Sequence, residues 1–330
     1  MEIPDYSHLR ENLAKVLTHN KKIWNDGLKD FAEKNRISLN EVVQKLEELD
    51  DPKFVIRLRR YVDDYTQNVI HRPSDVIYQR EQIGIVPVEW IKAEKAPDSP
   101  LILFFHGGGY AFGGLEASWQ TPTQLSKIAH IKILSVNYRH APEHPYPAAL
   151  NDAMAIYDYL LTTKSLEPKQ IVVSGGSAGG GLALALLLRL RDESKPLPAG
   201  AALFSPWTDL KFTGASLKAN KNKDPDLMES DLQILASIYS GSPRKRKLPY
   251  VSPVYGDFTG LPPLLVDAGE LEILLDDSSR LVEKAEKAGV EIHFKEWKDM
   301  NHVFHSLFDH IPEPNQAFQR VAEFLKKVIN

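Results

Sequence analysis

Residues 171–181 read IVVSGGSAGGG, a short apolar run that ends in glycines around a single serine. Within this run, residues 175–179 match the pattern G-x-S-x-G, in which the serine sits on a sharp turn from strand to helix. Small residues beside the serine allow the strand and the helix to approach closely. The helix that follows directs its N-terminus at the site, where it favours a developing negative charge. The run therefore predicts Ser177 as a nucleophile.

Glycine clusters after a strand also bind phosphates, which gives two alternatives to a serine nucleophile. A phosphate-binding P-loop ends in Gly-Lys-Ser or Gly-Lys-Thr, and this run has no lysine. A dinucleotide-binding turn belongs to the first strand-turn-helix unit, whereas this cluster lies in the middle of the chain. Both alternatives fit less well than the serine nucleophile.

A second glycine run, His106-Gly-Gly-Gly109, directly follows the apolar residues 101–105. Consecutive glycines leave backbone amides free to face a substrate carbonyl, and each such donor is worth about 3 kcal/mol in acyl transfer. We expect the amides of Gly107, Gly108 and Ala178 to form the oxyanion hole. His106 precedes these donors at the end of a strand, which favours a structural role over that of a base.

Strand and helix patterns alternate along most of the chain. Short apolar or alternating runs predict strands at 86–91, 101–105, 133–136, 171–173, 201–204, 263–266 and 292–297. Helical patterns occupy 118–129, 148–161, 179–191, 276–288 and 315–328. This alternation predicts an α/β fold with a mostly parallel central sheet covered by helices on both faces.

Two segments depart from this rhythm. Residues 1–70 are polar with apolar residues at helical spacing, and Ser38 followed by Glu41 resembles a capping box. Residues 207–258 contain helix and loop signals but no convincing strand. We expect the first segment to be a helical covering element and the second to be a cap inserted over the strand ends.

Composition excludes several classes of function. The 330 residues include 40 Lys and Arg against 44 Asp and Glu, with a net charge of −4, and no basic face suggests nucleic-acid binding. Cysteine is absent, so disulfides and thiol chemistry are excluded. No run reaches the roughly 18 apolar residues of a membrane span, and the N-terminus is not that of a signal peptide. We therefore expect a cytoplasmic protein that binds no membrane.

The glycine motifs, together with residues 137–147 (NYRHAPEHPYP) and 205–210 (SPWTDL), resemble the hormone-sensitive-lipase-like family of α/β-hydrolases. The resemblance covers roughly residues 75–330, in order. It implies an α/β-hydrolase domain at 71–330, an N-terminal helical cap segment at 1–70 and a cap insertion at about 207–258. Within the family, bacterial carboxylesterases, acetyl esterases and lactone hydrolases match best.

A serine nucleophile needs a base, and in this fold the chain order is serine, acid, histidine. His302 lies in a loop after the last strand, where the histidine of the family sits, and we predict it as the base. His305 is the alternative, or else a residue of the following turn. His293 falls inside a strand, and His310 is expected at the surface.

The acid is expected in the segment after the strand at 263–266. Many relatives have Asp-Pro-Leu at a position where this chain has Glu272-Ile-Leu, so the resemblance assigns the acid to Glu272. Asp276 and Asp277 fit the first turn of a helix, where carboxylates are favoured. Glu270 is a weaker competitor.

The predicted reaction is the hydrolysis of short-chain acyl esters, acetyl to hexanoyl, through an acyl-enzyme, without a metal or another cofactor. His140 and His144 have a metal-like spacing, but Pro142 interrupts it and the family uses this stretch structurally. The family's cap lines the substrate pocket, so candidate lining residues are Tyr110, Phe112, Trp207, Phe212 and Leu217, each of which could equally belong to the core.

Three alternative functions share parts of this pattern. A lactone hydrolase would use the same triad, and a peptidase would need a gating domain that the sequence does not suggest. A non-catalytic receptor is the alternative of another class, but receptors that resemble this family lack the histidine present here as His302. Relatives often dimerise through the last strand or helix, so the resemblance implies a homodimer.

Overall fold

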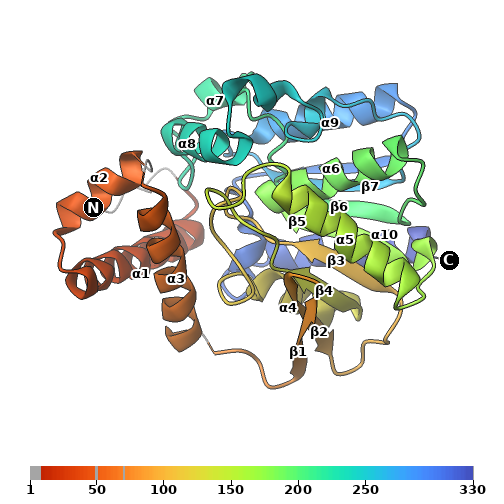
Figure 1. The fold of residues 1–330 in the computed structure, drawn as a ribbon, viewed down its shortest axis with the longest axis horizontal. Helices are drawn as coiled ribbons and strands as arrows, with labels where there is room; N and C mark the ends of the chain where they lie inside the picture. The colour runs from red at the N-terminus through yellow and green to blue at the C-terminus, as the bar shows by residue number, and fades with distance from the viewer. Residues whose placement is uncertain (1–8, 49–50, 70, 330) are drawn as a thin grey trace.

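The computed structural model describes residues 9–48, 51–69 and 71–329, so residues 1–8, 49–50, 70 and 330 of the predicted regions lie outside it. Its centre is an eight-stranded sheet in the order β1-β2-β4-β3-β5-β6-β7-β8 (Figure 1). The strands are β1 (Val76–Ile83), β2 (Val86–Ala93), β3 (Leu101–Phe105), β4 (Lys132–Val136), β5 (Ile171–Gly176), β6 (Gly200–Phe204), β7 (Leu264–Gly269) and β8 (Ile292–Trp297).

The sheet is parallel from β4 to β8, and only β2 pairs antiparallel, with β1 on one side and β4 on the other. Each of the strands predicted from the sequence is present. The sequence did not predict the ends of β1, because its residues are mostly exposed or half-buried and show only a weak alternation of apolar and polar side chains.

Helices cover both faces of the sheet, as predicted. One face packs on α5 (Ala148–Thr162), α6 (Ala178–Asp192) and α9 (Leu275–Lys287), and the other on α4 (Gln120–Ala129) and α10 (Glu313–Val328). The buried strand β3 shows why: Leu101, Leu103 and Phe105 belong to the first core, whereas Ile102 and Phe104 belong to the second. Alternate side chains of a strand point to opposite faces, so a strand apolar at every position is buried on both.

The N-terminal residues form α1 (Glu11–Asn35), α2 (Leu39–Glu48) and α3 (Pro52–Val69). These helices share a small apolar core of their own, which includes Phe31, Val42 and Phe54. The hydroxyl of Ser38 accepts a hydrogen bond from the Glu41 amide at 3.1 Å, which is one half of the expected capping box.

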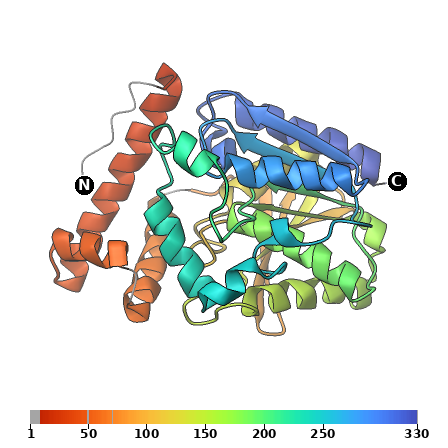
Figure 2. The ribbon, with the colours of Figure 1, turned by 90° about the horizontal axis from the view of Figure 1, so that it is seen from above.

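Residues 207–258, all of which the structure describes, contain α7 (Ser216–Ala219), α8 (Glu229–Ser240) and two short 3-10 helices but no strand. In Figures 1 and 2 the helix α8 lies beside α2 and α3, at the carboxyl ends of the parallel strands. Across residues 9–48, 51–69 and 71–329, no helix combines the length and the apolar character that crossing a membrane requires.

Candidate active site

Ser177 occupies the turn between β5 and α6 in a backbone conformation that is rare for a residue with a side chain, with φ 53° and ψ −123°. Such strain persists only where the surroundings hold it. Here the Ser177 amide donates to the Phe204 carbonyl at 2.9 Å, and the Ser177 carbonyl accepts from the Trp207 amide at 3.0 Å. A Cβ at Gly179 would collide with the carbonyl oxygen of Phe105, so this close approach of helix to strand requires glycine.

The glycine loop after β3, residues 106–113, lies directly against this turn, and we call it the oxyanion loop after the role that the sequence predicts for its amides. A Cβ on Gly107 would lie 3.4 Å from Ser177 Cβ. The Gly108 carbonyl accepts from the amides of Ala111 at 3.1 Å and Phe112 at 2.8 Å, and its φ of 105° suits glycine. The Ala178 amide, at the first position of α6, has no partner within its own helix. The elements that carry the three expected donors therefore meet at Ser177.

His106 is buried at the base of the oxyanion loop. Its Nδ1 donates to the Gly107 carbonyl at 2.7 Å, its Nε2 lies 3.3 Å from Nε2 of His140, and its ring stacks on Tyr138 at 4.3 Å. Burial lowers the pKa of His106 to about 4, despite the bond to the Gly107 carbonyl. A neutral imidazole bonded in this way supports the loop, in line with the structural role expected for it.

Glu272 and His302 form an ion pair whose atoms Oε2 and Nδ1 are 2.8 Å apart. The Glu272 side chain is fully buried and that of His302 is 8% exposed. The carboxylate can only accept, so Nδ1 carries the proton of this bond. The opposite ring atom, Nε2, is buried and has no hydrogen-bond partner among the described residues.

The loop that carries His302 packs against the serine turn. A Cβ on Gly176 would lie 3.3 Å from Cγ1 of Val303, the residue after His302. The His302 imidazole and Ser177 are thus brought to one place by adjacent loops at the strand ends.

Ser205 supports this pair and was not singled out from the sequence. Its hydroxyl donates to Glu272 Oε1 at 2.6 Å and accepts from the Val303 amide at 3.1 Å. The Gly269 amide also donates to Glu272 Oε1, at 2.5 Å. Ser205 is the first residue of the segment SPWTDL, which carries part of the family resemblance. No sequence pattern assigns a hydrogen-bond partner to a buried serine hydroxyl, so its bond to Glu272 could not be predicted.

The other histidines after Ser177 lie elsewhere. His305 is fully buried between Phe204 and Phe304, with Nε2 3.9 Å from Asp267 Oδ2. His293 lies in β8 and bonds Glu291 at 2.8 Å, and His310 is exposed. Among the acids, Glu270 accepts from the Asp299 amide at 2.9 Å instead of facing His302.

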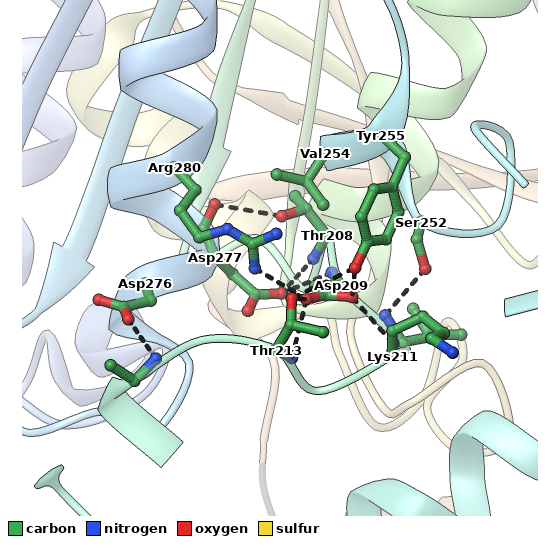
Figure 3. Close-up of polar contacts among 12 residues, drawn as sticks. Thr208, Asp209, Lys211, Thr213, Ser252, Val254, Tyr255, Asp276, Asp277 and Arg280 are labelled. Carbon is green, nitrogen blue, oxygen red and sulfur yellow. Dashed lines mark hydrogen bonds and ion pairs between the residues drawn. The ribbon is translucent and has the colours of Figure 1, made fainter. Parts of the chain in front are cut away.

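Asp276 and Asp277 lie in the first turn of α9, as expected, but they do more than face the helix dipole. Asp277 Oδ2 accepts from the amides of Thr208 and Asp209, at 2.6 and 2.7 Å (Figure 3). Asp276 Oδ2 accepts from the Ala215 amide at 2.5 Å. Both carboxyl groups therefore hold the base of the 207–258 insertion on α9.

A neighbouring loop adds two further carboxyl groups. Asp224 Oδ2 accepts from the Ile273 amide at 2.7 Å, and Asp226 Oδ2 accepts from Asn301 Nδ2 at 2.5 Å. Desolvation lowers the pKa of His302. The charge and hydrogen bond of Glu272, followed by the charges of Asp224 and Asp226, raise it by more than desolvation lowers it. The pKa of His302 therefore lies above its ordinary value.

A cavity of about 240 Å³ opens beside the oxyanion loop. Its lining includes Gly107, Gly108, Gly176 and Val303 from the site, and, farther out, Ala117, Ser118, Thr121 and Ser306.

The five residues proposed from the sequence as pocket lining are not among those that line this cavity. Tyr110 stacks on Tyr239 at 3.6 Å, and Tyr110, Trp207 and Leu217 are buried in the main core. Phe212 packs against that core, and Phe112 packs between α3 and α8.

Comparisons with known proteins agree with this architecture. The family model for the alpha/beta hydrolase fold matches residues 102–306. An acetyl-hydrolase of Streptomyces hygroscopicus is 39% identical over 254 residues, which cover 77% of this chain and 83% of that protein. An esterase of Acinetobacter venetianus is 41% identical, covering 72% and 77%.

Among solved structures, an esterase of the bacterial hormone-sensitive lipase family superposes with a TM-score of 0.79 and 36% identity, covering 88% of this chain and 98% of that one. The fold class and the resemblance seen in the sequence are both confirmed. This chain belongs to the alpha/beta hydrolase fold family and, within it, to the carboxylic-ester hydrolases of the hormone-sensitive-lipase type.

Proposed function

We propose that this serine carboxylesterase cleaves short-chain acyl esters with Ser177 as nucleophile, His302 as general base and acid, and Glu272 as the orienting acid. The observation that carries the proposal is the buried Glu272–His302 pair, with 2.8 Å between its atoms. The loop that carries His302 packs against the serine turn. Nδ1 is committed to Glu272, which leaves Nε2 to take a proton.

In the acylation step, the Ser177 hydroxyl attacks the ester carbonyl and its proton passes to His302 Nε2. The negative charge that develops on the carbonyl oxygen is stabilised by the amides of Gly107, Gly108 and Ala178. The tetrahedral intermediate then collapses, and the leaving alcohol takes the proton from His302. Glu272 stabilises the imidazolium during both transfers without itself accepting the proton.

In the deacylation step, His302 removes a proton from water as the water attacks the acyl-enzyme carbonyl. The same three amides hold the second oxyanion. His302 then returns the proton to Ser177, which releases the carboxylic acid and restores the enzyme.

The size of the cavity and the name of one relative support short acyl groups. At about 30 Å³ for one water molecule, about 240 Å³ is the volume of about eight water-sized groups, which suits acyl groups up to about hexanoyl. The Streptomyces relative is named an acetyl-hydrolase. The N-terminal helices and the 207–258 insertion are proposed to act as the cap over this site. No observed feature favours a lactone or a non-catalytic ligand over a linear ester.

The experiment is a series of p-nitrophenyl esters from acetate to dodecanoate, with small lactones in parallel, on the wild type and on Ser177→Ala. We expect turnover to be highest for acetate to hexanoate and to disappear in Ser177→Ala. A wild type that turns over none of the esters would refute the proposal, and faster turnover of lactones would reassign the substrate. A cytoplasmic location, a homodimer and the absence of nucleic-acid binding stay predictions.

A further inference from the structure

Arg59, on α3, joins the N-terminal helices to the oxyanion loop. Its Nε donates to the Ala111 carbonyl at 2.6 Å, and its Nη2 donates to the Ala141 carbonyl at 2.7 Å. Nη1 and Nη2 also bind the two carboxylate oxygens of Glu143, at 2.9 and 3.0 Å. The Arg59 side chain is only 12% exposed. This planar, two-point geometry is one that arginine can satisfy and lysine cannot.

The two carbonyls that Arg59 binds belong to segments that already contact each other. The Ala111 amide donates to the Gly108 carbonyl at 3.1 Å, and the Ala141 amide donates to the Tyr110 carbonyl at 2.9 Å. Arg59 therefore closes a ring of hydrogen bonds around the turn at 108–111. Without it, both carbonyls and the Glu143 carboxylate would lose their donor in a partly buried place.

Apolar contacts surround this ring. Val55, one helical turn before Arg59, is fully buried against Ala111, and Leu235 and Ile238 of α8 pack on the same pair. A Cβ on Gly109 would collide with Leu235. The oxyanion loop is thus enclosed between α3 and α8, and Arg59 supplies the polar bonds of this enclosure.

We propose that Arg59 is a positioning residue for ester hydrolysis, because it fixes the oxyanion loop so that the amides of Gly107 and Gly108 face the developing charge. This inference rests on the proposed function, in which those amides form the oxyanion hole. Such donors act only when they lie about 3 Å from the oxyanion, and a displacement of about 1 Å costs on the order of 100-fold in rate.

The test compares Arg59→Met and Arg59→Lys with Arg57→Met, which removes an exposed arginine from the same helix. Rates are divided by the number of active sites, titrated with a phosphonate that labels the serine, so that only folded molecules are counted. We expect kcat per site to fall about 10- to 100-fold in Arg59→Met with little change in KM, and less in Arg59→Lys. Arg57→Met should match the wild type.

A second measurement separates positioning from a general loss of structure. A trifluoromethyl ketone forms a tetrahedral adduct whose oxyanion needs the same amides, whereas a neutral product alcohol does not. In Arg59→Met the ketone should bind more weakly by the factor lost in kcat/KM, and the alcohol should bind as it does to the wild type. Unchanged kcat per site or unchanged ketone affinity overturns the inference. In that case an active wild type leaves the proposed function intact, whereas an inert wild type refutes the function itself.

Discussion

Two buried carboxyl groups that lie five residues apart, Glu272 and Asp277, differ in the partners that bind them. Glu272 is fully buried and accepts hydrogen bonds from His302, Ser205 and the Gly269 amide. Asp277 is 3% exposed and accepts from two backbone amides, with Asp209 close by. Burial, followed by the charge of Asp209, raises the pKa of Asp277 to about 8. The difference shows that burial alone does not mark the acid of a triad, because only one of the two groups has an imidazole to orient.

The largest expected difference between Glu272 and Asp277 is in the kcat of variants that neutralise each carboxyl group in turn. Glu272→Gln should lower kcat about 10³- to 10⁴-fold, since the amide no longer holds the imidazole in the productive tautomer or stabilises its charge. Asp277→Asn should keep kcat within about two-fold, because the hydrogen bonds of Asp277 serve the base of the insertion. Initial rates on p-nitrophenyl acetate, divided by titrated active sites, measure both. Equal losses in the two variants would remove the distinction.

Ser205→Ala offers a smaller perturbation of the same site. It removes the hydroxyl that links Glu272 to the loop of His302, so we expect kcat to fall about 10-fold, equivalent to about 1.4 kcal/mol. Ser174→Ala is the matched control, since the hydroxyl of this buried serine of β5 donates to the Ala202 carbonyl, away from Glu272 and His302. Both variants should lose stability by thermal melting, and only Ser205→Ala should lose activity. A full loss of activity in Ser174→Ala would show that rate follows stability alone.

The comparison also explains what the sequence can and cannot predict. The turn at Ser177 was predictable because its constraints are local: a buried strand, a strained serine and glycines at fixed spacing. The strands were predictable for the same reason, since an apolar run such as LILFF at 101–105 fits a sheet buried on both faces.

The partners of buried polar groups were not predictable in this way. Ser205 and Glu272 are far apart in sequence and meet only because β6 and β7 are neighbours in the sheet. For Tyr110 and Trp207 the sequence left pocket lining and core as equal alternatives, and both lie in the core, since the direction of a loop side chain depends on what covers the loop. Arg59 lies in a helix whose sequence carries no chemical motif.

A change at Asp226 tests the electrostatic side of the comparison. His302 must be neutral to act as a base, so activity should appear as the pH rises through its pKa, which lies above the ordinary value of 6.5. Glu272, Asp224 and Asp226 are the carboxyl groups that raise it. Asp226→Asn removes one of the three charges and should move the acidic limb of the kcat/KM profile to lower pH by a few tenths of a unit.

The control for this shift is Glu229→Gln, at an exposed position in the first turn of α8. Its profile should overlay that of the wild type. A limb that moves to higher pH in Asp226→Asn would mean that Asp226 does not stabilise the imidazolium.

The smallest effect on catalysis, and the clearest on stability, is expected at Asp277. With a folded pKa of about 8 against an ordinary value of 3.8, the folded protein keeps a proton that the unfolded chain releases. The free energy of unfolding should therefore fall as the pH rises from about 4 to about 8, and this contribution should level off above that window. Asparagine cannot ionise, so Asp277→Asn should lose less stability than the wild type between about pH 5 and about pH 8 in urea unfolding. Parallel curves for the two proteins would show that Asp277 is ionised when folded, and the contrast with Glu272 would then rest on hydrogen-bond partners alone.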